Sequence, residues 1–138
     1  MAEDQDASPE RHDVVAGVLV RGDRVLLCHR HPGRRWYPDV WDLPGGHLEP
    51  GEGAVAALAR ELREELGVEA VPDPAVLAGL ETEELRLTVL RVPRWDGEPV
   101  VVDADEHDDI GWFTLAEAAR LDLADPAYPA LLARALEG

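Results

Sequence analysis

Apolar residues gather in short runs in the first third of the chain and recur at helical spacing farther on. Residues 14–20 and 25–30 are apolar runs rich in valine and leucine, which predict two β-strands. Gly22 and Asp23 lie between the two runs and predict a hairpin turn, because glycine tolerates the backbone angles of such turns. Residues 31–40 contain two prolines and a glycine and predict a loop.

The clearest helix is predicted in the middle of the chain, over about residues 53–66. Val55, Leu58, Leu62 and Leu66 recur there at intervals of three and four, which places them on one face of a helix. The glycine that follows Leu66 can adopt the left-handed conformation that commonly ends a helix. We therefore expect this helix to bury its leucine face and to end at residue 66.

The remaining pattern predicts one α+β domain in which a mixed β-sheet is flanked by helices. Residues 41–46 are expected to lead through a short strand into a tight turn, and further strands are expected at residues 76–80, 84–92, 99–102 and 110–113. Thr114 and Glu117 form a capping box for a short helix, because each side chain can bond a free backbone N–H in the first turn. Asp125-Pro126 predicts the start of a last helix that runs to about residue 136.

The net charge changes the range of partners that this domain can have. The formal charge is −16, with 29 acidic against 13 basic residues. Such a surface repels polyphosphate backbones, so a long nucleic-acid partner is not expected. A small phosphorylated ligand remains compatible with the charge if a cation or a group of arginines reverses the field where it binds.

The termini and the single cysteine suggest an intracellular protein without membrane segments. Residues 1–12 are polar and acidic and predict a disordered tail without the apolar stretch of a secretory signal. No segment approaches the roughly 20 apolar residues that cross a bilayer, so we expect a cytoplasmic location. Cys28 lies in an apolar run and is expected to be a small buried residue, and one cysteine excludes a disulfide framework.

Three carboxylates on the central helix are the first candidate chemistry. Glu61, Glu64 and Glu65 stand at i, i+3 and i+4 and therefore share one face. Each like-charge pair costs about 0.2–0.5 kcal/mol on an isolated helix, and these lie near the C-terminal end, where the helix dipole favours cations. A solvated acidic face is the alternative. The placement favours a bound hard cation, Mg²⁺ first and Mn²⁺ as a substitute.

Residues around this patch complete a motif that resembles one family. Gly46 is followed after five residues by Glu52, and after seven more by Arg60-Glu61-Leu62-Arg63-Glu64-Glu65-Leu66-Gly67-Val68. This is similar at every position to the signature of the Nudix hydrolases. The resemblance implies the Nudix fold over residues 13–138, a mixed β-sheet sandwiched between α-helices, and a metal-dependent hydrolase of phosphoric anhydride bonds.

The resemblance also implies roles for individual residues. Glu61, Glu64 and Glu65 are expected to hold divalent metal, and the carbonyl of Gly45 is expected to be a further ligand. Glu52 and Arg60 are expected to orient the loop and the carboxylates. A later loop often adds an acidic group, and Glu106 is the choice here, with Asp105 and Asp108 as rivals. The general base is left open between Glu61 and Glu106.

Substrate contacts are expected from the loop before the motif and from the C-terminal segment. Arg30, Arg34 and Arg35 could bind phosphate, with ligand-free surface arginines as the alternative. Trp36, Tyr37 and Tyr128 could stack on a base, although aromatic residues at such positions also close the edge of a core.

Three functions are compatible with these residues, and each involves a small nucleotide as the ligand. The protein is expected to be a monomer or a homodimer. The favoured one is hydrolysis of a nucleoside triphosphate, ordinary or oxidised, to a monophosphate and pyrophosphate. The short chain resembles that branch of the family, although it lacks the asparagine that would recognise an oxidised guanine. The alternatives are an ADP-ribose or nucleotide-sugar pyrophosphatase and a nucleotide-binding regulator without turnover. The intact motif disfavours the regulator.

Overall fold

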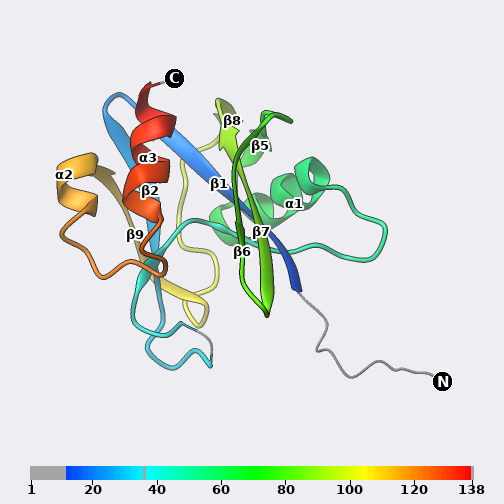
Figure 1. Cartoon of the computed structure of the whole chain (residues 1–138), viewed down its shortest axis with the longest axis horizontal. Helices are drawn as coiled ribbons and strands as arrows, with labels where there is room; N and C mark the ends of the chain where they lie inside the picture. The colour runs from blue at the N-terminus through cyan, green and yellow to red at the C-terminus, as the bar shows by residue number, and fades with distance from the viewer. Residues whose placement is uncertain (1–11, 36, 138) are drawn as a thin grey trace.

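The protein is described by a computed structural model that covers residues 12–35 and 37–137, with a mixed β-sheet at its centre (Figure 1). The elements, in chain order, are β1 His12–Arg21, β2 Arg24–Arg30, β3 Trp41–Asp42, β4 Gly45–His47, α1 Ala54–Leu66, β5 Glu69–Val71, β6 Val76–Glu81, β7 Leu85–Val92, β8 Arg94–Asp96, β9 His107–Thr114, α2 Leu115–Ala118 and α3 Tyr128–Glu137. The combination of a mixed sheet and separate helices confirms the predicted α+β class.

The main sheet has seven strands, and β1 and β2 lie at its centre. The hydrogen-bonded order is β3-β2-β1-β7-β6, while β4 also pairs with β1 and β9 also pairs with β2. Strands β1 and β7 are parallel, and the other pairs of this sheet are antiparallel. β1 and β2 pair only at the hairpin end, from Val20 with Val25 to Arg21 with Arg24. Beyond that end, each of the two strands has its own further partners.

Hydrophobic cores on both faces explain why β1 is a nearly continuous apolar run. On one face, Val15 and Leu19 of β1 belong to a buried cluster with Leu58, Leu62 and Leu66 of α1. On the other face, the neighbouring β1 residues belong to a second cluster with residues of α3: Ala16, Val18, Tyr128, Leu131, Leu132 and Ala135. Helices therefore cover both faces of the sheet.

Local sequence signals correctly located the first hairpin and the central helix. Gly22 has φ +63° in the two-residue turn between β1 and β2. Helix α1 ends at Leu66, and Gly67 has φ +70° while its N–H donates to the carbonyl of Arg63 at 3.1 Å. The buried face of α1 differs from the predicted one, because Val55 is 38% exposed while Ala57 and Glu65 are buried.

The predicted strand at residues 99–102 is wrong. The N–H of Val100 donates to the carbonyl of Leu66 at 3.1 Å, and that of Val102 donates to the carbonyl of Glu65 at 3.2 Å. These residues thus bond carbonyls at the C-terminal end of α1 that have no partner within the helix. Their apolar side chains are about half exposed, so the run of valines is not a core strand.

Other boundaries differ because tertiary contacts set them. The three-residue strands β5 and β8 were not predicted, and they pair with each other in a separate two-stranded sheet. Helix α3 begins at Tyr128, because Asp125 forms a turn that bonds the N–H groups of Ala127 and Tyr128. His12 is the first residue of β1, one residue earlier than the predicted start of the domain, and the rest of the predicted tail lies outside the described residues.

Within the described ranges, no helix combines the length and apolar character required to span a bilayer.

Candidate metal and catalytic site

Two glycines bring the backbone of β4 against the carboxylates of α1. β4 pairs antiparallel with β1, with Gly45 opposite Ala16 and Gly46 opposite Val15. A Cβ at Gly45 would lie 2.0 Å from the carbonyl oxygen of Val15, and a Cβ at Gly46 would lie 2.4 Å from the carboxyl carbon of Glu61. Gly45 therefore requires glycine, whereas a side chain at Gly46 would displace the carboxylate of Glu61. The close approach places a peptide chain directly beside the acidic face of α1.

Glu65 is the most buried carboxyl group of this face. It is 8% exposed, and its Oε1 accepts a hydrogen bond from the N–H of Gly45 at 3.2 Å. Burial raises the pKa of Glu65 well above its usual value, and the nearby charges of Glu106 and Glu61 raise it further. A side-chain hydrogen bond also joins Glu61 to Glu65, and burial raises the pKa of Glu61. Such a pair needs a shared proton or a cation to balance its charge.

Arg60 lies at the centre of a network of carboxylates. Its Nε and Nη2 donate to the two oxygens of Glu52 at 2.8 and 2.9 Å, and Nη2 also donates to the carbonyl of His47 at 3.0 Å. Its Nη1 donates to Glu61 at 3.0 Å and to Glu64 at 3.2 Å. The Arg60 guanidinium lowers the pKa of Glu52 to about 2. The network therefore joins the loop before α1 to two carboxylates of the helix.

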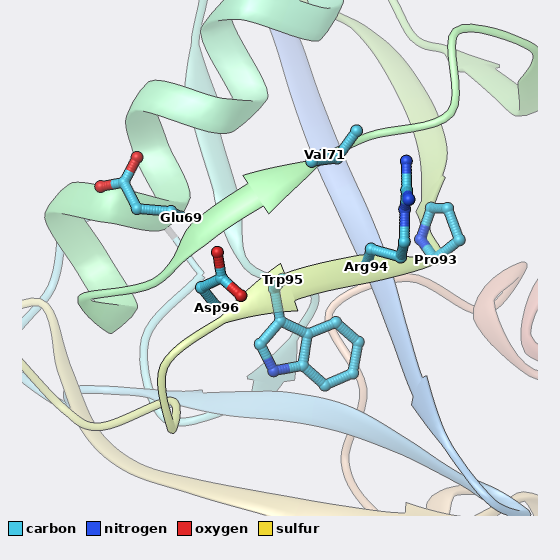
Figure 2. Close-up of a pocket in the computed structure, with 6 residues that line it drawn as sticks. All are labelled: Glu69, Val71, Pro93, Arg94, Trp95 and Asp96. Atoms are coloured by element: carbon cyan, nitrogen blue, oxygen red, sulfur yellow. The ribbon is translucent and has the colours of Figure 1, made fainter.

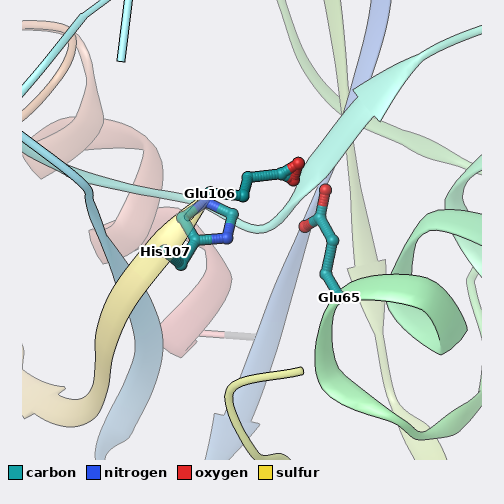
Figure 3. A group of neighbouring side chains, drawn as sticks. All are labelled: Glu65, Glu106 and His107. Atoms are coloured by element: carbon teal, nitrogen blue, oxygen red, sulfur yellow. The ribbon is translucent and has the colours of Figure 1, made fainter. Parts of the chain in front are cut away.

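A second group of potential ligands joins Glu65 of α1 to Glu106 and His107, where the chain enters β9. A carboxylate oxygen each of Glu65 and Glu106 and a ring nitrogen of His107 all lie within 4.8 Å of one another. Figure 3 shows Glu65 extending from its helix towards Glu106 and His107, which come from the opposite side. Two carboxylates and an imidazole at this separation suit a divalent cation, since carboxylate oxygens suit magnesium and manganese and imidazole suits transition metals.

His107 was not among the residues selected from the sequence. It is 6% exposed, and burial lowers its pKa to about 4, assisted by the charges of Arg30 and Arg34. The ring is therefore neutral near pH 7 and keeps a nitrogen lone pair. The only sequence signal was its position next to Glu106, and its burial depends on the pairing of β9 with β2, where it lies opposite Arg30.

The other expected acidic residues have different surroundings. Glu64 has a side chain that is 58% exposed and pairs with Arg60, so it lies outside the group formed with His107. The rival Asp108 accepts from the ring of His29 at 2.6 Å, and the rival Asp105 is exposed, with its N–H bonded to Asp103. Among the residues considered for the later loop, Glu106 is therefore the one that lies beside Glu65.

The expected substrate-binding residues in the loop before the motif have different surroundings. Arg34 lies near the cluster, with Nη1 3.6 Å from Oε1 of Glu106. Arg30 donates to the carbonyl of Tyr37 at 2.9 Å, and Tyr37 is 53% exposed. Arg35 is also exposed, whereas Trp36 lies outside the described residues.

Tyr128 occupies the core position that was considered as the alternative to base stacking. The residue is 4% exposed and its hydroxyl donates to Oδ1 of Asp42 at 2.6 Å. Asp42 is itself held by the N–H of Leu43 at 2.7 Å. The ring of Tyr128 is thus a core residue with a satisfied polar end, which agrees with the alternative that it closes the core.

A surface hollow of about 530 Å³ lies over the small β5–β8 sheet (Figure 2). It is lined by Glu69, Val71, Pro93, Arg94, Trp95 and Asp96. None of these residues belongs to the carboxylate network, and Glu69 is paired with Arg63 at 2.9 Å. This hollow is therefore separate from the candidate site in its residues and in its chemistry.

Comparison with known proteins gives the same family over most of the chain. A family model described as the NUDIX domain matches residues 10–134. The chain is 41% identical over 139 residues to a Mycobacterium tuberculosis protein provisionally named 8-oxo-dGTP diphosphatase 2, with 91% of this chain and 90% of that protein covered. It is 35% identical over 122 residues to CTP pyrophosphohydrolase of Escherichia coli, with 86% and 87% covered.

Solved structures agree with these sequence relatives. The MutT NUDIX hydrolase from Burkholderia pseudomallei matches with a TM-score of 0.80 and 28% identity, covering 91% of this chain and 98% of that one. The solution structure of the E. coli ORF135 protein matches with a TM-score of 0.74 and 32% identity, covering 95% and 92%. Nudix hydrolases generally use divalent metal ions, which agrees with the chemistry of the Glu65, Glu106 and His107 group.

Proposed function

The chain belongs to the Nudix family, and we propose that it is a magnesium-dependent hydrolase that converts nucleoside triphosphates to nucleoside monophosphates and pyrophosphate. The observation that carries this proposal is the convergence of Glu61, Glu65 and Glu106 beside the Arg60 network. The burial of Glu65 next to two further carboxylates leaves a concentration of negative charge that a divalent cation neutralises.

The proposed metal site consists of Glu65 and Glu106, with Glu61, Glu64 and the carbonyl of Gly45 as further ligands. Magnesium bound there supplies positive charge that offsets the charge of the substrate phosphates. Arg60 holds Glu61 and Glu64 in position through its 3.0 and 3.2 Å hydrogen bonds. Glu52 in turn fixes Arg60, so we assign both as positioning residues.

The proposed reaction breaks the anhydride between the α- and β-phosphates. The oxygen of a water molecule attacks phosphorus, the bridging P–O bond breaks, and the leaving phosphate oxygen takes the bonding electrons. Glu61 or Glu106 accepts the proton of the attacking water. Arg34, 3.6 Å from Glu106, is placed to contact a phosphate oxygen of the substrate.

Nucleoside triphosphates are favoured as the substrate class by the names of two similar proteins. One is provisionally named for 8-oxo-dGTP and the other for CTP, and both match along nearly their whole length. The two names differ in the base, so the proposal extends to the triphosphate class and leaves ordinary and oxidised bases as members of one substrate panel.

A matched pair of variants tests this function. Glu65→Gln removes the buried charge with little change in shape, and we expect loss of magnesium-dependent pyrophosphate release from CTP and 8-oxo-dGTP. Glu69→Gln changes an exposed carboxylate that pairs with Arg63, and we expect activity equal to that of the unchanged protein. Equal activity of the Glu65→Gln variant and the unchanged protein would place the metal site elsewhere.

A further inference from the structure

The imidazole of His107 belongs to a buried residue but has no hydrogen-bond partner among the described residues. The residue is 6% exposed, and its backbone N–H donates to the carbonyl of Asp103 at 3.1 Å. Within residues 12–35 and 37–137, no group forms a hydrogen bond with its ring. Buried polar groups in proteins are usually satisfied by a hydrogen bond or another partner. Neither ring nitrogen is among the fully enclosed polar atoms that lack a partner in the described residues, so both unpartnered nitrogens can be reached by a ligand from solvent.

The position of the His107 ring beside two carboxylates indicates which kind of ligand could bind it. A ring nitrogen lies within 4.8 Å of carboxylate oxygens of both Glu65 and Glu106, and these two oxygens also lie within 4.8 Å of each other. Figure 3 shows the three side chains facing a common space from α1 and from the start of β9. One ion placed among them would contact all three, since ligands on opposite sides of a divalent ion lie about 4–5 Å apart.

His29 provides a contrast within the same sheet. Its two ring nitrogens are bonded to Asp108 at 2.6 Å and to Asp39 at 3.0 Å, so it has no capacity left for a metal. His107 is close to carboxylates at a longer separation, which leaves space between the groups instead of a direct hydrogen bond. The two histidines thus show the difference between a paired ring and a ring facing a potential ligand site.

We propose that His107 is a nitrogen ligand of the divalent metal bound by Glu65 and Glu106, so that the site has a mixed oxygen and nitrogen donor set. This inference rests on the proposed metal site and adds a residue that the Nudix signature does not contain. Mn²⁺ is the first member of the transition-metal affinity series and accepts an imidazole nitrogen more readily than Mg²⁺, which prefers oxygen ligands. The protein should therefore bind Mn²⁺ more tightly than Mg²⁺ by a margin that depends on His107.

The test is electron spin-echo spectroscopy of Mn²⁺ bound to the full chain without substrate. The unchanged protein should show modulation from a directly bound ¹⁴N, and labelling its histidines with ¹⁵N should replace that pattern with the ¹⁵N one. The chain has five histidines, so variants are needed to assign the signal. His107→Asn and His107→Gln, which place an amide near either ring nitrogen, should change the imidazole pattern and weaken Mn²⁺ binding by about 10-fold or more.

A matched control is His12→Gln, which changes an exposed histidine at the first position of β1. It should keep both the nitrogen signal and the Mn²⁺ affinity. Bound Mn²⁺ without nitrogen modulation in the unchanged protein would overturn the role of His107 and leave the carboxylate site standing. The absence of Mn²⁺ binding would overturn the proposed metal site together with this inference. Because the first readout uses the unchanged protein, it does not depend on either variant folding.

Discussion

Arg60 and Glu52 form a two-point ion pair, with Nε to Oε2 at 2.8 Å and Nη2 to Oε1 at 2.9 Å. Because Glu52 precedes α1 and Arg60 lies within it, this pair fixes the loop that leads from β4 into the helix. The third guanidinium nitrogen remains available for Glu61 and Glu64. One side chain therefore controls the positions of two carboxylates expected to hold metal.

Arg60→Lys should disrupt this network although the charge is kept. A lysine has one ammonium group and lacks the planar donors that bind both oxygens of Glu52 while reaching Glu61. We expect metal-dependent activity to fall by about 10- to 100-fold, the usual effect of losing a group that orients metal ligands. Arg63→Lys, an exposed change on the same helix, is the control for steady-state kinetics. Equal kinetics of the two variants would show that the network has no positioning role.

Gly46→Ala should displace the carboxylate of Glu61. The added methyl carbon would lie 2.4 Å from the carboxyl carbon and 2.5 Å from its Oε2, which is closer than atoms can pack. We expect about 10-fold or greater loss of Mn²⁺ affinity, measured by titration calorimetry. Gly53→Ala has nothing within 4 Å of its added carbon and should bind as the unchanged protein does. Normal affinity in Gly46→Ala would mean that Glu61 does not contribute to the site.

The contacts of His29 should make a pH-dependent contribution to the free energy of unfolding. Burial acts to lower its pKa, but hydrogen bonds and charges from Asp108 and Asp39 outweigh burial and raise the pKa above 6.5. The folded state thus binds the proton more strongly than the unfolded state does. The stabilisation is complete below pH 6.5 and is lost as the pH rises through the folded pKa.

This term is measured as the difference in free energy of unfolding between the unchanged protein and His29→Gln. Urea titrations with a chelator keep metal binding out of the comparison. The advantage of the unchanged protein should shrink as the pH is raised from 6.5. A difference that stays constant over this pH range would show that the contacts of His29 with Asp39 and Asp108 do not depend on its charge.

Leu58→Ala tests which face of α1 is buried. Leu58 is fully buried between the helix and β1, so the change should lower the free energy of unfolding by about 2–5 kcal/mol. Val55→Ala removes a side chain that is 38% exposed, and its effect should stay near 0.5 kcal/mol. Urea denaturation measures both variants. Similar losses would contradict the exposed position of Val55.

Signals that depend on neighbouring residues predicted much of the fold. The leucine spacing and Gly67 located α1, and Gly22 located the first hairpin. The parallel pairing of β1 with β7 depends on residues far apart in the chain, so no local pattern specified it. Val100 and Val102 resemble a strand in sequence, but their N–H groups bond the end of α1 instead. Local propensity was overridden there by a tertiary contact.

In the candidate site, too, some features follow from local sequence and others depend on tertiary contacts. The spacing of Glu61, Glu64 and Glu65 predicted a shared helical face, because a helix places such positions together whatever surrounds it. Glu106, the residue chosen for the later loop, lies within 4.8 Å of Glu65 through a carboxylate oxygen of each. His107 could not be recognised, because its burial and direction come from the pairing of β9 with β2.

The most direct test of the account is product analysis of the purified protein with Mg²⁺ across ordinary and oxidised nucleoside triphosphates, ADP-ribose, nucleotide sugars and dinucleoside polyphosphates. We predict that one or more nucleoside triphosphates give monophosphate and pyrophosphate in equal amounts, and that a chelator stops the reaction. Turnover confined to ADP-ribose or nucleotide sugars would contradict the proposed substrate class. No turnover of any substrate with Mg²⁺ or Mn²⁺ would contradict the proposed hydrolase itself.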